Sequence, residues 1–133
     1  MENRRGDKIV EIEEYLEKFG SIIPNDFDEY IEDFMRKAAC ERYFEKIVEA
    51  VIDLVFLVIK EKEFRSPISD RDALNILSEN NIVSGELSEK LGDAKSMRNI
   101  IIHEYGFIDD KKIFRSIKNE LINDVEKFLE AVR

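Results

Sequence analysis

Residues 43–58 read YFEKIVEAVIDLVFLV and carry the clearest periodic pattern in the chain. Their apolar residues recur every three or four positions, which is the spacing of one face of an α-helix. The same period continues outward from Phe27 to about Lys62, and Asn25 or Asp26 can cap its start. The sequence therefore predicts one long helix here, with a bend near residues 38–40.

Helical spacing also dominates the rest of the chain. Four further helices are predicted at about residues 7–19, 69–80, 84–105 and 109–132. The last three are expected to begin at Ser69, at Ser84 and at Asp109 or Asp110. Gly20 and Pro24 interrupt the first of these patterns, and Pro67 places residues 64–68 in a loop. No segment alternates with a period of two between turn residues, so no sheet is expected. The pattern predicts an all-α antiparallel bundle of about five helices with short connections.

Length and composition agree with such a bundle. The chain has 133 residues, of which 44% are hydrophobic and 38% charged, with only 5 Gly and 2 Pro. A chain of this length normally forms one core. We therefore expect a single helical domain over residues 1–133.

The charge limits the kinds of partner. A formal net charge of -9 argues against broad, salt-driven binding of nucleic acid, because such binding needs a cationic face. The N-terminus lacks the continuous apolar run of a signal peptide. The longest apolar run, residues 50–59, contains Asp53 and is shorter than the roughly 20 residues of a membrane span. We expect a cytoplasmic protein without membrane contact.

Cys40 is the only cysteine, so no disulfide can form within the chain. Its apolar neighbours favour a small buried side chain. A reactive thiol is the less favoured alternative.

Any acid–base chemistry must use His103, the only histidine. No zinc-site spacing, phosphate-binding glycine loop or Ser-His-Asp pattern occurs in the sequence. On a helix, Asn99 and His103 lie about 100° and 140° around the axis from Arg98. An arginine donates two hydrogen bonds to a phosphate, and a histidine exchanges protons near neutral pH. The trio has the groups needed for phosphodiester cleavage by a ribose 2′-hydroxyl.

The neighbouring isoleucines suggest a partner subunit. Ile100, Ile101 and Ile102 occupy most directions around the same helix, which indicates burial on more than one side. A helix of a small bundle usually keeps one face exposed to solvent. Burial of that face as well is most simply explained by a second subunit in a two-fold dimer. Arg98 then lies in an apolar sector, where a guanidinium needs an anion.

The same residues can also have purely structural roles, and their spacing, taken alone, favours these roles over catalysis. Arg98 can pair with a carboxylate of the long helix, from Glu41, Glu45 or Glu49. His103 can cap the carbonyl groups at a helix end, and a buried tyrosine at position 105 can anchor that end. These roles would make the protein a structural interaction protein.

Residues 98–105, RNIIIHEY, resemble the Arg-x4-His-x-Tyr motif of the HepT-like toxins among HEPN-domain proteins. The resemblance extends from about residue 38 to the C-terminus. It implies an all-helical, HEPN-like homodimer and a metal-independent ribonuclease that needs no cofactor. It also implies that Arg98 binds phosphate, that His103 transfers a proton or orients the phosphate, and that Asn99 is the adjacent polar residue.

The resemblance implies a partner and a mode of control as well. Toxins of this family are typically encoded beside a minimal nucleotidyltransferase antitoxin that adds AMP to the motif tyrosine, here Tyr105. We therefore expect the toxin of a type II- or type VII-like HEPN/MNT toxin–antitoxin system, cleaving RNA in a cleft at the dimer interface. The alternative is a non-catalytic helical subunit that binds nucleotide or substrate for a nucleotidyltransferase complex.

Overall fold

The computed structural model describes residues 3–103 and 109–133, and all of their regular structure is helical. The elements are α1 (Arg4–Ile22), α2 (Phe27–Glu32), α3 (Phe34–Glu61), α4 (Asp70–Glu79), α5 (Gly85–His103), α6 (Asp110–Arg115), η1 (Ser116–Glu120) and α7 (Leu121–Val132). The all-α prediction is confirmed.

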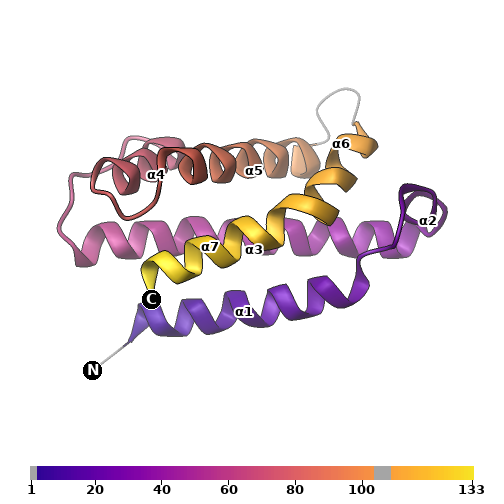
Figure 1. Cartoon of the computed structure of the whole chain (residues 1–133), viewed down its shortest axis with the longest axis horizontal. Helices are drawn as coiled ribbons and strands as arrows, with labels where there is room; N and C mark the ends of the chain where they lie inside the picture. The colour runs from indigo at the N-terminus through magenta and orange to yellow at the C-terminus, as the bar shows by residue number, and fades with distance from the viewer. Residues whose placement is uncertain (1–2, 104–108) are drawn as a thin grey trace.

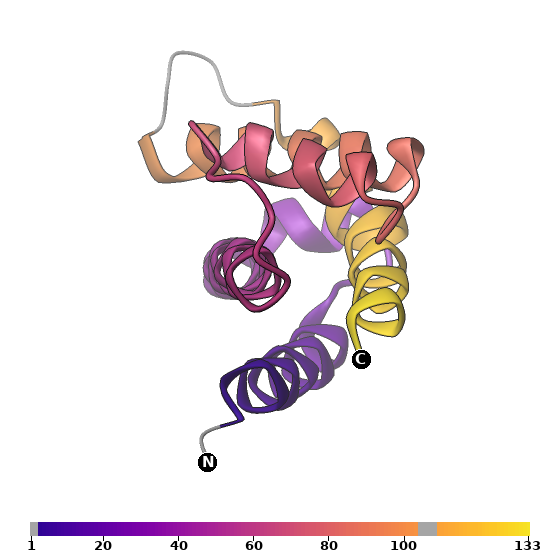
Figure 2. The same ribbon diagram turned by 90° about the vertical axis from the view of Figure 1, so that its left-hand side faces the viewer.

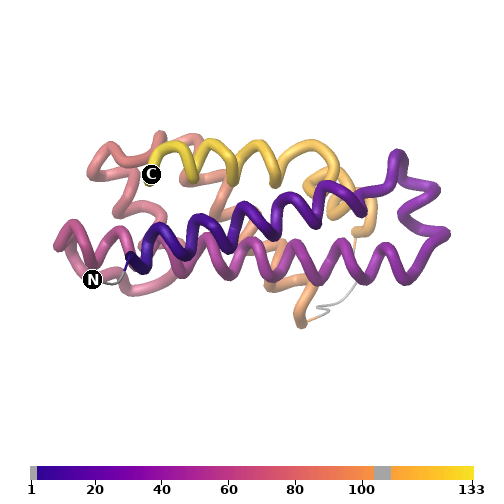
Figure 3. Tube along the Cα trace, turned by 90° about the horizontal axis from the view of Figure 1, so that it is seen from below, coloured from indigo at the N-terminus to yellow at the C-terminus, as the bar shows by residue number. Residues whose placement is uncertain are grey.

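The four long helices α1, α3, α5 and α7 alternate in direction along the chain (Figure 1). Figure 2 looks nearly along α1 and α3 and shows α5 lying across the top of the bundle, and Figure 3 shows α1 lying beside α3. The short helix α4 packs on α3 and α5. The predicted antiparallel bundle is confirmed, and its centre is filled by large side chains with almost no exposed surface, among them Phe19, Tyr30, Phe44, Ile47, Leu54, Leu74, Leu121 and Phe128.

The predicted long helix is divided in two at Asp33. This residue leaves helical geometry, with φ -99° and ψ 87°, and its Oδ1 accepts a hydrogen bond from the backbone N–H of Arg36 at 3.0 Å. The side chain thereby caps the start of α3. Helix α3 runs without a break through residues 38–40, where the sequence predicted a bend. The apolar period passes unchanged across Asp33, so periodicity alone did not reveal the break.

Helix α1 continues past Gly20, where the sequence predicted that it would stop. Gly20 lies inside α1, which ends at Ile22, two residues before Pro24. A glycine inside a helix costs about 1 kcal/mol relative to alanine, which the packing of a whole helix can offset. The burial of Phe19 and the partial burial of Ile22 supply apolar contact at this end.

The predicted last helix contains a π-helical segment. Residues 110–115 form α6, residues 116–120 form the π-helical η1, and the chain then returns to α-helix in α7. A π turn closes its hydrogen bonds over five residues instead of four. Apolar periodicity did not predict this change, because Ile113 before the segment, Ile117 within it and Leu121 after it are all buried.

Three predicted caps are present. The hydroxyl oxygens of Ser69 and Ser84 each accept a backbone hydrogen bond at 3.0 Å, from Asp72 and Leu87 respectively. Asp109 Oδ1 accepts one from the backbone of Lys112 at 3.2 Å. These contacts satisfy N–H groups that have no partner in the first turn of a helix. They fix where α4, α5 and α6 begin.

Cys40 is fully buried, in agreement with the favoured prediction. Its Sγ lies 3.7 Å from the carbonyl oxygen of Ile22, and burial raises the pKa of the thiol to about 11. A thiol of this kind forms little of the reactive thiolate. Separately, none of the helices in the described part of the chain is long and apolar enough to cross a membrane.

Candidate active site

Helix α5 carries the predicted site residues in its last two turns. It begins after the Ser84 cap and packs against α3, α4 and α7. Arg98, Asn99 and His103 all belong to it, whereas Tyr105 lies outside the described residues.

Arg98 is turned towards α3. Its side chain is 19% exposed, and its Nη2 lies 3.6 Å from Oε2 of Glu49, which is one of the three carboxylates considered from the sequence. This distance is that of an ion pair but exceeds hydrogen-bond length. Among the residues that the structure describes, the buried Nε of Arg98 has no hydrogen-bond partner. The predicted structural pairing is thus present, but it leaves the guanidinium incompletely satisfied.

An incompletely paired guanidinium is unfavourable inside a protein. A buried donor without an acceptor costs about 1–3 kcal/mol, and more when the group is charged. An anion with several oxygens, such as a phosphate, removes this cost because it accepts more than one hydrogen bond from the planar guanidinium fork. The environment of Arg98 therefore favours the binding of an anion.

Asn99 is held by a residue that the sequence analysis missed. Lys95 Nζ donates a 3.0 Å hydrogen bond to Asn99 Oδ1, and the same ammonium lies 3.4 Å from Oδ2 of Asp70 in α4. Because its oxygen is engaged, the amide group of Asn99 retains Nδ2 as the donor for a ligand. The separation of four residues between Lys95 and Asn99 was the signal that could have identified this pair.

His103 is the last residue of α5, and its side chain is exposed. It follows Asn99 by four residues, so both lie on the same side of the helix. It follows Arg98 by five, which corresponds to about 140° around the axis and about 7.5 Å along it. One chain therefore brings Asn99 and His103 to a common face but turns Arg98 towards α3.

The three isoleucines differ in burial. Ile101 is buried, whereas Ile100 and Ile102 are each 39% exposed. The chain by itself does not cover the two outer isoleucines, which flank the polar residues of the site. Burial of all three remains a prediction that depends on a second subunit.

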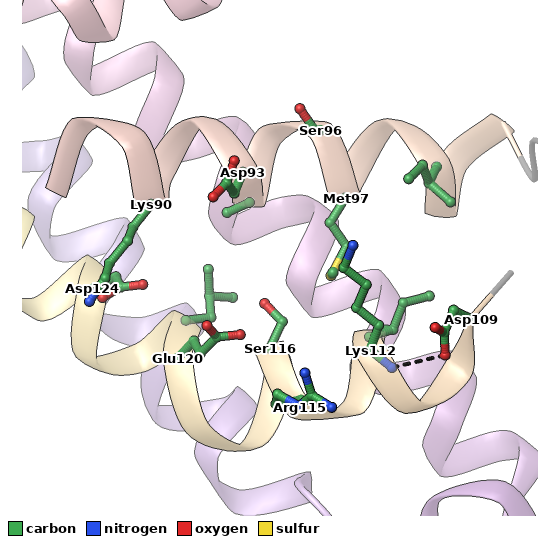
Figure 4. A pocket seen from close by; sticks show the side chains of 14 residues that line it. Lys90, Asp93, Ser96, Met97, Asp109, Lys112, Arg115, Ser116, Glu120 and Asp124 are labelled. Atoms are coloured by element: carbon green, nitrogen blue, oxygen red, sulfur yellow. Dashed lines mark hydrogen bonds between the residues drawn. The ribbon is translucent and has the colours of Figure 1, made fainter. Parts of the chain in front are cut away.

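A pocket of about 560 Å³ lies on another side of α5, between this helix and the α6–η1–α7 segment (Figure 4). Lys90 and Met97 line it from α5, while Lys112 and Asp124 line it from the other segment. Its lining includes none of Arg98, Asn99 or His103. The three predicted site residues therefore do not contribute to this pocket, although their neighbours Met97 and Ile100 do. Within residues 3–103 and 109–133, no three His, Cys, Asp or Glu side chains are grouped so as to hold a metal ion.

Two nucleases are similar in sequence to this chain over most of its length. The mRNA nuclease HepT of Shewanella oneidensis is 23% identical over 127 residues, which cover 96% of this chain and 94% of the relative. The tRNA nuclease HepT of Aphanizomenon flos-aquae is 26% identical over 104 residues, which cover 78% of this chain and 69% of the relative.

The fold is shared with a toxin of solved structure. The tri-AMPylated HEPN toxin of Shewanella oneidensis, in complex with its MNT antitoxin, is similar to this chain with a TM-score of 0.90 at 22% identity. The match covers 99% of this chain and 98% of the toxin. Residues 12–132 also match the family described as Ribonuclease HepT-like. The chain therefore belongs to the Ribonuclease HepT-like family, as the motif at residues 98–105 predicted.

Proposed function

We propose that this protein is a ribonuclease toxin that acts in the cytoplasm and cleaves RNA without a metal ion. In this proposal Arg98 binds the phosphate at the cleavage site, His103 transfers protons, and Asn99 donates a hydrogen bond to a phosphate oxygen or orients the imidazole. The observation that carries the proposal is the mostly buried and incompletely paired guanidinium of Arg98, in a chain of the Ribonuclease HepT-like family.

The reaction is a transesterification within the RNA chain. The ribose 2′-oxygen attacks the adjacent phosphorus as its proton passes to a base, and the bond from phosphorus to the 5′-oxygen breaks as that oxygen takes up a proton. The products are a 2′,3′-cyclic phosphate and a 5′-hydroxyl end. An imidazole can serve as the base or the acid, while a guanidinium stabilises the charge that develops on the phosphate.

The active form in this proposal is a homodimer. The exposed Ile100 and Ile102 support it, because they would place an apolar contact beside the site residues. A second copy would add its own Arg98 and His103 to a shared cleft. The local positive charge of two arginines would attract RNA to a chain whose net charge is -9.

We propose a minimal nucleotidyltransferase as antitoxin and Tyr105 as the residue that it modifies. The tyrosine oxygen would bond to the α-phosphorus of ATP, with release of pyrophosphate and of the hydroxyl proton. The AMP groups carried by the Shewanella oneidensis toxin in its complex with MNT antitoxin support this assignment. Coexpression with the proposed nucleotidyltransferase antitoxin should therefore add the mass of AMP to the wild-type protein and not to Tyr105→Phe.

Incubation of the purified protein with cellular RNA in EDTA tests the proposed activity. The wild type should release fragments with 2′,3′-cyclic phosphate ends, and Arg98→Ala or His103→Ala should release few. Arg42→Ala is the matched control, because Arg42 is an exposed arginine on α3 that pairs with Glu45 at 3.0 Å. If RNA stays intact while nucleotide binding depends on Arg98, the non-catalytic subunit of a nucleotidyltransferase complex is the better account.

A further inference from the structure

Glu49 is the charged group that lies against Arg98. It stands on α3, and its carboxylate is 60% exposed although it lies 3.6 Å from the guanidinium. The two partners therefore differ, since the arginine is mostly enclosed and the carboxylate is mostly in solvent. The carboxylate can move away into solvent at little cost, whereas the guanidinium stays in place.

A phosphate bound to Arg98 would occupy the same neighbourhood as this carboxylate. A phosphate and a carboxylate a few ångströms apart repel each other, so each weakens the binding of the other at Arg98. RNA must therefore displace Glu49 or bind in spite of its charge. Either event reduces the affinity for RNA below the value that Arg98 alone would give.

We propose that Glu49 determines substrate specificity by competing with RNA phosphate for Arg98. This inference rests on the proposed ribonuclease function. Without Glu49, Arg98 would bind any accessible phosphate backbone, since phosphate contacts carry no sequence information. With Glu49 in place, only an RNA that makes further favourable contacts with the protein overcomes the competition.

A purely structural ion pair predicts the opposite result. If Glu49 only holds α3 and α5 together, its removal leaves Arg98 without its carboxylate partner and weakens the site. If Glu49 competes with phosphate, its removal strengthens RNA binding. The sign of the change in affinity separates the two roles.

The test measures RNA affinity by fluorescence anisotropy in a His103→Ala background, so that the labelled RNA is not cleaved. Glu49→Gln should lower the dissociation constant about three- to tenfold at low salt, and the gain should shrink as salt screens the charges. Glu49→Asp keeps the negative charge and should stay closer to the parent protein.

Glu61→Gln is the matched control. Glu61 lies 12 residues further along the same helix, its side chain is 44% exposed, and it pairs with Arg5 of α1 at 3.2 Å. The Glu61→Gln variant reports how the loss of one negative charge affects RNA affinity in general. A gain for Glu49→Gln that clearly exceeds that of Glu61→Gln supports the proposal. Equal gains, or weaker binding by Glu49→Gln, would overturn it.

A thermodynamic cycle with Arg98 adds a second criterion. In an Arg98→Ala background, Glu49→Gln should gain no more affinity than Glu61→Gln, because the competition needs the guanidinium. An undiminished extra gain in that background contradicts the mechanism. RNA cleavage by the wild type, measured alongside, keeps the two hypotheses apart. A wild type without cleavage rejects the ribonuclease, whereas normal cleavage with no extra gain rejects only the role of Glu49.

Discussion

The ammonium of Lys95 donates a 3.0 Å hydrogen bond to Oδ1 of Asn99, one helical turn further along α5. Asp70 of α4 lies 3.4 Å from the same ammonium and thus links the motif helix to its neighbour. The Asn99 amide is fixed by this contact before any substrate arrives. We infer that Lys95 is a positioning residue that acts through Asn99.

Replacement of Lys95 by methionine tests this role. Lys95→Met keeps the length of the side chain but removes the donor, so Asn99 can rotate and the cleavage rate should fall about two- to tenfold, the equivalent of one hydrogen bond. Lys95→Arg, which restores a donor, should recover part of the rate. Lys90→Met is the control on the same helix, since Lys90 pairs with Glu86 at 3.4 Å. A similar loss of cleavage rate in Lys90→Met would show that the rate depends on net charge and not on the contact with Asn99.

Charge at the exposed isoleucines should prevent the proposed dimer. Ile100→Glu and Ile102→Glu would each bury a carboxylate in an apolar contact, which is costly without a partner. Both variants should therefore elute as monomers in size-exclusion chromatography with light scattering and should lose RNA cleavage. Val10→Glu, at an exposed valine of α1, should keep the wild-type mass. Variants at 100 and 102 that remain dimeric would place the interface elsewhere.

Tyr30 offers a test of the core. Its ring is fully buried, and its hydroxyl has no hydrogen-bond partner in the described part of the structure. Tyr30→Phe removes that polar atom and should leave the free energy of unfolding unchanged or raise it by about 1–3 kcal/mol. Phe44→Ala, which removes a whole buried ring, should lower it by about 3–5 kcal/mol. Urea unfolding measures both, and a clear loss for Tyr30→Phe would reveal a partner for the hydroxyl.

The carboxylate of Asp72 should make stability depend on pH. Arg65 donates hydrogen bonds of 2.8 and 2.9 Å to it, and these hold the pKa of Asp72 at about 2, below its ordinary value of 3.8. Because the folded pKa is the lower one, this contribution is complete above about pH 4 and is lost as the pH falls towards about 2. Urea unfolding of Asp72→Asn should show a smaller decline over that range than the wild type. An identical decline in both proteins would exclude Asp72 as its source.

Most of the fold could be predicted because the apolar spacing and the capping residues act locally. Ser69, Ser84 and Asp109 cap helices where the sequence indicated. The break at Asp33 was missed because an aspartate inside an apolar period can be either a solvent-facing residue or a cap. In the structure α2 packs beside α6, a contact between residues far apart in the sequence that local periodicity does not contain.

The candidate site was predicted in part for similar reasons. The motif identified Arg98, Asn99 and His103, and Glu49 was one of three carboxylates that spacing allowed as partners of Arg98. Which of the three lies opposite Arg98 depends on how α3 and α5 are aligned, and that is set by packing across the whole bundle. The contact of Lys95 with Asp70 depends on the placement of α4 in the same way.

The most direct test of the central claim is the initial rate at which the purified protein cleaves a defined RNA in EDTA, compared with Arg98→Ala and His103→Ala. The account predicts cleavage by the wild type and rates at least about 100-fold lower for both variants, with unchanged thermal unfolding. Unchanged rates in both variants, or no cleavage by a folded, unmodified wild-type protein, would contradict it.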